Sequence, residues 1–126
     1  MKNYTYLRFP EFKRKAVTLS YDDGVIFDEK LIDIFNRYGL KATFNINSGL
    51  FYPAGGKTRL TESQAVALYK DSGHEIAVHG AKHLSLTEVP IETACKDVLE
   101  DRIALEKLFG RIVRGMAYAY GVYSDK

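Results

Sequence analysis

The stretch AVTLSYDDG, residues 16–24, is an apolar run that ends in two carboxylates and a glycine. A second stretch, EIAVHGAKH at residues 75–83, is another apolar run, followed by two histidines. Short apolar runs bounded by polar or turn residues predict buried strands. In barrels of parallel strands wrapped by helices, the carboxyl ends of the strands carry the chemistry. Both polar clusters are therefore expected at one edge of one sheet.

The surrounding pattern alternates strands with helices. The expected strands are residues 16–21, 42–46, 75–78 and 112–119, and the expected helices are 27–38, 61–72 and 91–110. Such alternation predicts parallel strands joined by helices, whereas a closed barrel takes about eight strands. We therefore expect an α/β fold that forms a partial (β/α) barrel, with parallel strands flanked by helices and the barrel incomplete in this chain. Its open sheet edges predict a homo-oligomer that covers them.

Local signals bound the expected helices. Thr61 and Gln64 form a capping box, Gly39 is expected just beyond the end of the first helix, and the last helix is expected to end at Gly110. The buried stripe of the last helix is expected to hold its apolar side chains, namely Ile91, Cys95, Val98, Leu105 and Leu108.

Composition excludes several classes of protein. The chain has 126 residues, 46% hydrophobic and 27% charged, which is typical of one globular domain. A single cysteine, Cys95, excludes an internal disulfide. The basic cluster at residues 13–15 has no aromatic stacking platform beside it, so a solvated edge is favoured over a nucleic-acid site. No membrane span of about 20 apolar residues is found. Without a leader-like N-terminus the expected location is cytoplasmic, or secreted if a leader was removed.

The two polar clusters together suit a metal. Asp23, His79 and His83 would supply one carboxylate and two imidazoles and leave positions open, while Asp22 could act as a general base. The two histidines share a face if a helical turn forms between them. The alternatives are that Asp22 and Asp23 only form a turn and that the histidines are unrelated. His74 precedes its strand, and we expect it to be structural or exposed.

The sequence resembles the polysaccharide deacetylases of the NodB-homology type. Their Thr-x-Asp-Asp-Gly motif is matched by residues 20–24, with serine for threonine, and their His-Ser/Thr-x-x-His motif by residues 79–83. Their Ala-Thr-Phe strand appears at residues 42–44, and their Gly-His-Glu-Ile run at residues 73–76. The resemblance covers the first half or so of that domain, so residues 1–126 are expected to be its N-terminal portion.

The resemblance implies a metal-dependent hydrolase that removes acetyl groups from N-acetylated or O-acetylated sugars, acting on carbon–nitrogen bonds other than peptide bonds. Asp22 would be the catalytic base, and Asp23, His79 and His83 would hold zinc, or another divalent ion such as cobalt. Tyr120 would offer its backbone N–H to the oxyanion. The expected partner is an acetylated carbohydrate, with no nucleic acid and no membrane.

The family's third motif, Arg-x-Pro-Tyr, corresponds to residues 117–120. The chain departs from it there, because Ala117 and Ala119 replace the arginine and the proline. Gly80 also lacks the hydroxyl that the family carries there. These departures keep two alternatives open: a catalytically impaired fragment that binds metal or carbohydrate, and a deacetylase-like hydrolase of small cytosolic amides.

Overall fold

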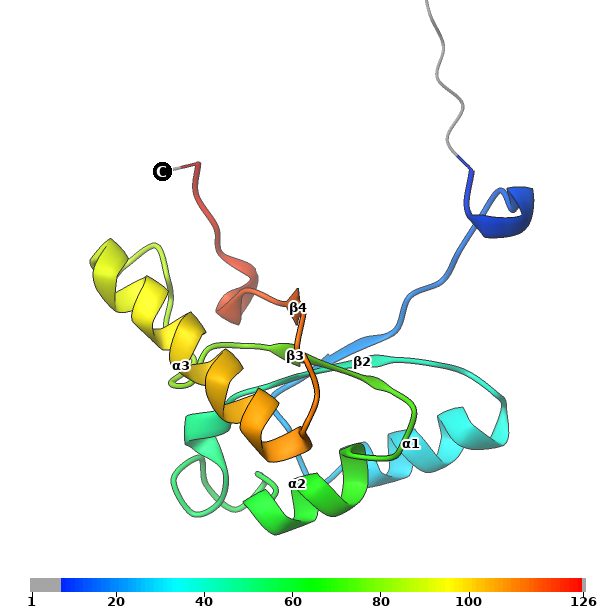
Figure 1. The fold of residues 1–126 in the computed structure, drawn as a ribbon, viewed down its shortest axis with the longest axis horizontal. Helices are drawn as coiled ribbons and strands as arrows, with labels where there is room; N and C mark the ends of the chain where they lie inside the picture. The colour runs from blue at the N-terminus through cyan, green and yellow to red at the C-terminus, as the bar shows by residue number, and fades with distance from the viewer. Residues whose placement is uncertain (1–7, 126) are drawn as a thin grey trace, which may run out of the picture.

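The computed structural model describes residues 8–125, which form a four-stranded parallel sheet with helices on one of its sides (Figure 1). The strands lie in the order β1-β2-β3-β4, and their bounds are Ser20–Asp22, Thr43–Ile46, Glu75–Val78 and Gly115–Met116. The helices α1 (Asp28–Arg37), α2 (Glu62–Tyr69) and α3 (Ile91–Phe109) connect them. The expected α/β fold of parallel strands is confirmed, and the sheet is open, not closed.

Side chains alternate between the two faces of the sheet, as the period of two requires. Phe44, Ile46, Ile76 and Val78 belong to the core cluster, together with Tyr69 from α2. The opposite face carries polar side chains, and there Thr43 donates to Glu75 Oε2 at 2.6 Å. The sheet thus has one apolar face against the helices and one polar face on which chemistry can be built.

Two expected strands are shorter in the structure. β1 begins only at Ser20, and Val17 is 86% exposed, so the prediction of a strand from residue 16 is wrong. β4 has two residues in place of the eight expected, because its pairing with β3 covers only Ala77 and Val78. In both cases an apolar run continues beyond the part that finds a partner strand.

The helix ends follow the sequence closely. Thr61 and Gln64 form the capping box, with the Thr61 hydroxyl accepting from the Gln64 N–H at 3.2 Å. Gly39 and Gly110 follow α1 and α3 with φ angles of +64° and +66°. These angles suit glycine because it has no Cβ to clash with the preceding turn.

The buried face of α3 differs from the predicted stripe. Of the five apolar residues expected there, Leu105 is buried and Val98 and Leu108 are partly buried against the core, while Ile91 and Cys95 are exposed. The buried positions instead include two carboxylates, Asp97 and Asp101. Apolar periodicity does not predict these two positions, because Asp97 and Asp101 accept hydrogen bonds from the loops at the carboxyl edge of the sheet.

Asp28 is a further buried acid, and we expect it to make the stability of the fold depend on pH. It accepts from Tyr69 Oη at 2.5 Å and from the Val25 N–H at 3.2 Å. Burial raises the pKa of Asp28 above its ordinary value of 3.8. The folded state therefore binds this proton more tightly, so the group's contribution favours folding at low pH and is lost as the pH rises through the folded pKa.

We expect Asp28→Asn to gain stability relative to the wild type as the pH rises from about 3 to 8. Urea unfolding of both proteins across that range measures the difference. A difference that does not change with pH would contradict this account of Asp28.

Among residues 8–125, no helix is long and apolar enough to cross a membrane.

Candidate metal centre

The carboxyl ends of β1, β2 and β3 bring the predicted site residues together. Parallel pairing sets Asp22 opposite Asn45, and β3 ends at Val78, directly before His79. The Asp23 N–H donates to the Asn45 carbonyl at 2.8 Å, which extends the pairing into the Asp-Asp-Gly turn. The sheet therefore places the aspartates and the histidines along one edge, as the sequence predicts.

Asp23, His79 and His83 form a set of possible metal ligands. One ligand atom from each residue lies within 4.8 Å of the others. Asp23 Oδ1 is 3.5 Å from His83 Nε2 and 3.9 Å from His79 Nε2. Two imidazoles and one carboxylate match a three-ligand site with an open position, the arrangement of catalytic zinc.

The carboxylate oxygen at the centre of this set has the environment of a cation ligand. Asp23 Oδ1 is buried and has no hydrogen-bond partner in the described part of the chain. Arg59 Nη2 lies 3.0 Å from it, an ion-pair contact that lacks hydrogen-bond alignment. Because a buried charged oxygen is costly unless paired, a positive ion between Asp23 and the histidines fits the residues present.

The hydrogen bond of His79 fixes which ring nitrogen is free. His79 Nδ1 lies 3.0 Å from the Ala117 carbonyl, and a carbonyl can only accept, so Nδ1 carries the proton. In a neutral ring Nε2 is then the nitrogen that can bind a metal, and it faces Asp22 and Asp23, each at 3.9 Å. Such orientation of a ligand histidine by a backbone carbonyl is usual in metal sites. Ala117 thus serves the site through its backbone.

His83 completes the set from an irregular turn. A helical turn, which would place both histidines on one face, does not form between them, and His83 has a φ of +55°. The two rings still meet edge to face, with their centroids 4.8 Å apart. Burial lowers the pKa of His83, although the Asp23 carboxylate opposes that shift. A lowered pKa favours the neutral imidazole, which is the form that binds metal.

The two buried carboxylates of α3 hold this turn. Asp101 Oδ2 accepts from the His79 N–H at 3.0 Å, and its Oδ1 accepts from the Ser48 N–H at 2.7 Å. Asp97 Oδ1 accepts from the Lys82 N–H at 3.0 Å. Burial raises the pKa of Asp101. The supporting role of Asp97 and Asp101 is not predicted from the sequence, because its only sign there is an acidic residue at a buried position of a helix.

Asp22 lies beside the three possible ligands. One of its carboxylate oxygens accepts a hydrogen bond, and the other faces the histidines. Asn45 Nδ2 donates to Asp22 Oδ1 at 2.7 Å and also contacts Ser20 Oγ at 2.8 Å. Asp22 Oδ2 lies 3.9 Å from His79 Nε2, and the side chain is 53% exposed. This arrangement suits a carboxylate that exchanges a proton with a reactant at the centre.

Tyr120 stands at the rim of the site. Its ring meets that of His83 edge to face, with a centroid distance of 4.5 Å, and the residue is 69% exposed. Its φ is +60°, so the backbone turns sharply at this point. His74 lies at the opposite end of β3, where its buried Nδ1 accepts from the Ala42 N–H at 3.2 Å, a structural role.

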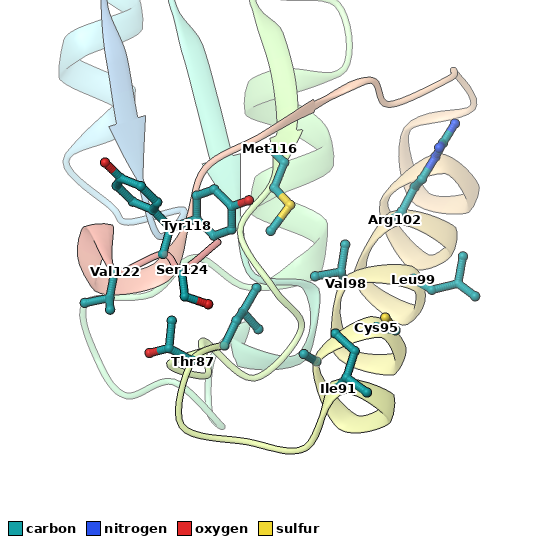
Figure 2. Close-up of a pocket in the computed structure, with 13 residues that line it drawn as sticks. Thr87, Ile91, Cys95, Val98, Leu99, Arg102, Met116, Tyr118, Val122 and Ser124 are labelled. Atoms are coloured by element: carbon teal, nitrogen blue, oxygen red, sulfur yellow. The ribbon is translucent and has the colours of Figure 1, made fainter. Parts of the chain in front are cut away.

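A separate apolar cavity of about 540 Å³ opens between α3 and residues 116–124. Figure 2 shows Ile91, Cys95 and Val98 reaching it from α3, with Met116 and Tyr118 on the segment that faces them. None of the ligand residues or Asp22 lines it. This cavity explains why Ile91 and Cys95 are exposed although they belong to an apolar pattern.

Comparison with known proteins gives a consistent result. A model of the polysaccharide deacetylase family matches residues 9–126. The chain is similar to the Streptococcus pyogenes deacetylase PplD, solved with acetate, at 26% identity and a TM-score of 0.78 over 89% of this chain and 49% of that one. The peptidoglycan deacetylase PdaC of Bacillus subtilis gives 23% identity and 0.68, covering 86% and 50%.

A polysaccharide deacetylase from Bacillus cereus shares the fold at 18% identity, with a TM-score of 0.75 over 90% of this chain and 36% of that one. The chain thus spans about half or less of the length of these three proteins. A search of curated proteins found no match.

Proposed function

Because the chain belongs to the polysaccharide deacetylase family, we propose that it is a metal-dependent hydrolase that removes acetyl groups from N-acetylated or O-acetylated sugars. The observation that carries this proposal is the convergence of Asp23, His79 and His83, with Asp22 beside them at the carboxyl edge of the sheet. A site that hydrolyses an acyl group needs a Lewis acid and a base within reach of the same acyl carbon. This edge of the sheet offers ligands for a metal ion as the Lewis acid and Asp22 as the base.

Zinc, or another divalent ion such as cobalt, would be held by Asp23 and by the Nε2 atoms of His79 and His83. Such an ion supplies Lewis-acid polarisation of the acyl carbonyl and activates water. Asp22 then accepts the proton of the attacking water at Oδ2, because Asn45 occupies its Oδ1. Once protonated, the Asp22 carboxyl can act as the acid and return this proton to the leaving amine or hydroxyl.

Tyr120 is proposed to donate its backbone N–H to the oxyanion that forms on the acyl group. Its position beside His83 supports this assignment, since the ring contact places the Tyr120 backbone at the rim of the site. An N–H aimed at the developing negative charge stabilises the transition state more than the ground state.

The surroundings of the site support a carbohydrate as substrate. A hollow next to His83 and Tyr120 is also lined by polar side chains, among them Lys82, Ser85 and Glu88. The hollow is open, and an exposed aromatic ring beside hydrogen-bonding groups suits a sugar, which has both apolar ring faces and hydroxyls. A homo-oligomer that covers the open sheet edges stays a prediction.

The second candidate is a protein that binds the ion or a carbohydrate without turnover. Ala117 favours it, because this residue contributes only its carbonyl to the site and brings no charged side chain to Asp22. A hydrolase of small amides is the third candidate, and the assay described next distinguishes it from the other two.

Acetate release tests the proposal. The chain is stripped with a chelator and reloaded with zinc. It is then assayed for acetate release from acetylated chito-oligosaccharides and acetylated xylan, and for ammonia release from a small ureide. We expect acetate from a sugar substrate, lost with chelator and restored by zinc. Turnover that survives complete removal of the metal would contradict metal dependence, and ion binding without turnover on any substrate would favour the second candidate.

A further inference from the structure

We propose that Arg59 is a positioning residue of the metal centre, whose guanidinium holds the Asp23 carboxylate in place opposite the two histidines. The inference rests on the proposed function, because it concerns the same ion. Arg59 lies in the segment before α2, far from Asp23 in the sequence, and no motif singles it out.

The backbone of Arg59 is fixed against the Asp-Asp-Gly turn. Arg59 and Val25 form an isolated antiparallel bridge, and the Leu60 N–H donates to the Gly24 carbonyl at 3.0 Å. The guanidinium therefore starts from a main chain that is tied to the turn it contacts.

The guanidinium contacts Asp23 at two points. Arg59 Nη2 lies 3.0 Å from Asp23 Oδ1, and Nη1 donates to the Asp23 carbonyl oxygen. The Arg59 side chain is 12% exposed, so these contacts are shielded from water. Asp23 itself has a φ of +85°, a conformation that non-glycine residues rarely adopt. A guanidinium that forms an ion pair with the carboxylate of Asp23 and donates a hydrogen bond to its carbonyl restrains such a residue.

Asn47 extends this restraint to the histidine turn. Its Oδ1 accepts from Arg59 Nη1 at 3.0 Å, and its Nδ2 donates to the carbonyls of His79 and Gly80 at 2.9 and 2.8 Å. Asn47 is 1% exposed. Arg59 and Asn47 thus form one hydrogen-bonded chain from the aspartate turn to the histidine turn, which carry all three ligands.

The planar, forked geometry of the Arg59 guanidinium, and not only its positive charge, is expected to matter for ion binding. A lysine keeps the positive charge but has a single ammonium group that cannot reach two acceptors in a fixed plane. Loss of an outer partner that orients a metal ligand typically costs 10–100-fold in metal affinity. Arg59→Lys is therefore expected to weaken ion binding by about 10–100-fold, and to change the ligand geometry around the ion that remains bound.

Cobalt titration of the wild type, Arg59→Lys and the control Arg37→Lys tests this. Arg37 is also paired with a carboxylate, Asp33, but in an exposed i,i+4 pair away from the site. Calorimetry gives the affinity, and visible absorption at saturation reports the geometry around cobalt. We expect Arg59→Lys to lose affinity and to alter the spectrum, and Arg37→Lys to match the wild type.

Three outcomes overturn the proposal. Equal affinity and an unchanged spectrum in Arg59→Lys would leave Arg59 no positioning role. Higher affinity would show that the guanidinium competes with the ion. Absence of ion binding by the folded wild type would overturn the metal proposal as well, which distinguishes the two failures. If Arg59→Lys does not fold, side-chain NMR of the wild type decides: slowed rotation of the Arg59 guanidinium supports the fork, and free rotation contradicts it.

Discussion

Replacing Asp22 by asparagine is expected to reduce acetate release by about 10²–10⁴-fold, the usual contribution of a general base. The substitution preserves shape, and the asparagine carbonyl oxygen can still accept from Asn45 Nδ2, which contacts Asp22 Oδ1 at 2.7 Å. What is lost is the ability of the second oxygen, which faces His79, to take a proton. Ion affinity should change little, because Asp23 and not its neighbour is the assigned carboxylate ligand.

The measurement is kcat for the zinc-loaded wild type and Asp22→Asn, with ion affinity measured on the same samples. Asp33→Asn is the matched control, because Asp33 is an exposed carboxylate paired only with Arg37 on α1. Activity of Asp22→Asn close to that of the wild type would remove Asp22 from the role of base. A loss of ion binding equal to that of a ligand variant would instead make Asp22 a ligand.

Gly80→Ala is expected to disrupt the histidine turn, with a loss of about 2–4 kcal/mol of stability. Gly80 has a φ of +80°, and a Cβ there would lie 2.5 Å from Asp97 Oδ2. That oxygen cannot simply move away, because Asp97 is buried and its Oδ1 holds the Lys82 N–H. Backbone strain and displacement of a buried carboxylate therefore add, and both act between the two histidine ligands.

Gly39→Ala separates the two effects. Gly39 has a similar φ of +64°, but nothing lies within 4 Å of a Cβ built there. Gly39→Ala should lower the free energy of unfolding by only about 1 kcal/mol, the cost of backbone strain, and leave ion affinity unchanged. Gly80→Ala should in addition lower ion affinity about tenfold or more. Thermal unfolding and cobalt titration of both variants give the comparison. Equal effects of the two substitutions would show that Asp97 does not constrain the turn.

The position of Gly80 illustrates what the sequence can and cannot reveal. The resemblance marks Gly80 as a departure from a motif that carries a serine or threonine, and the sequence offers no reason for it. The structure supplies one: the buried carboxylate of Asp97 occupies the space that a side chain at residue 80 would need. This reason depends on a contact across 17 positions in the chain, which no local pattern encodes.

The convergence of Asp23, His79 and His83 could be predicted, because it follows from two local facts. Asp23 and His79 each come directly after a strand, and parallel pairing carries strand ends to one edge whatever the exact register. A helical turn between His79 and His83 was not needed for their rings to meet, since a positive φ at His83 achieves the same result.

The residues that support the site could not be predicted in the same way. Arg59, Asn47 and Asp101 act through contacts between distant segments, and each belongs to a residue type that is usually exposed. In α3 the predicted stripe of apolar side chains left out Asp101, which is fully buried. Buried polar residues near a site are thus the part of the fold that periodicity misassigns.

The central claim is that Asp23, His79 and His83 bind one divalent ion, and a zinc or cobalt titration by calorimetry on the wild type and His83→Ala tests it most directly. The control is His74→Asn, which removes the third histidine but can keep an acceptor for the Ala42 N–H. We expect one ion per chain in the wild type and in the control, and affinity at least about 100-fold weaker in His83→Ala. Absence of binding by the folded wild type, or equal binding by His83→Ala, would contradict the account.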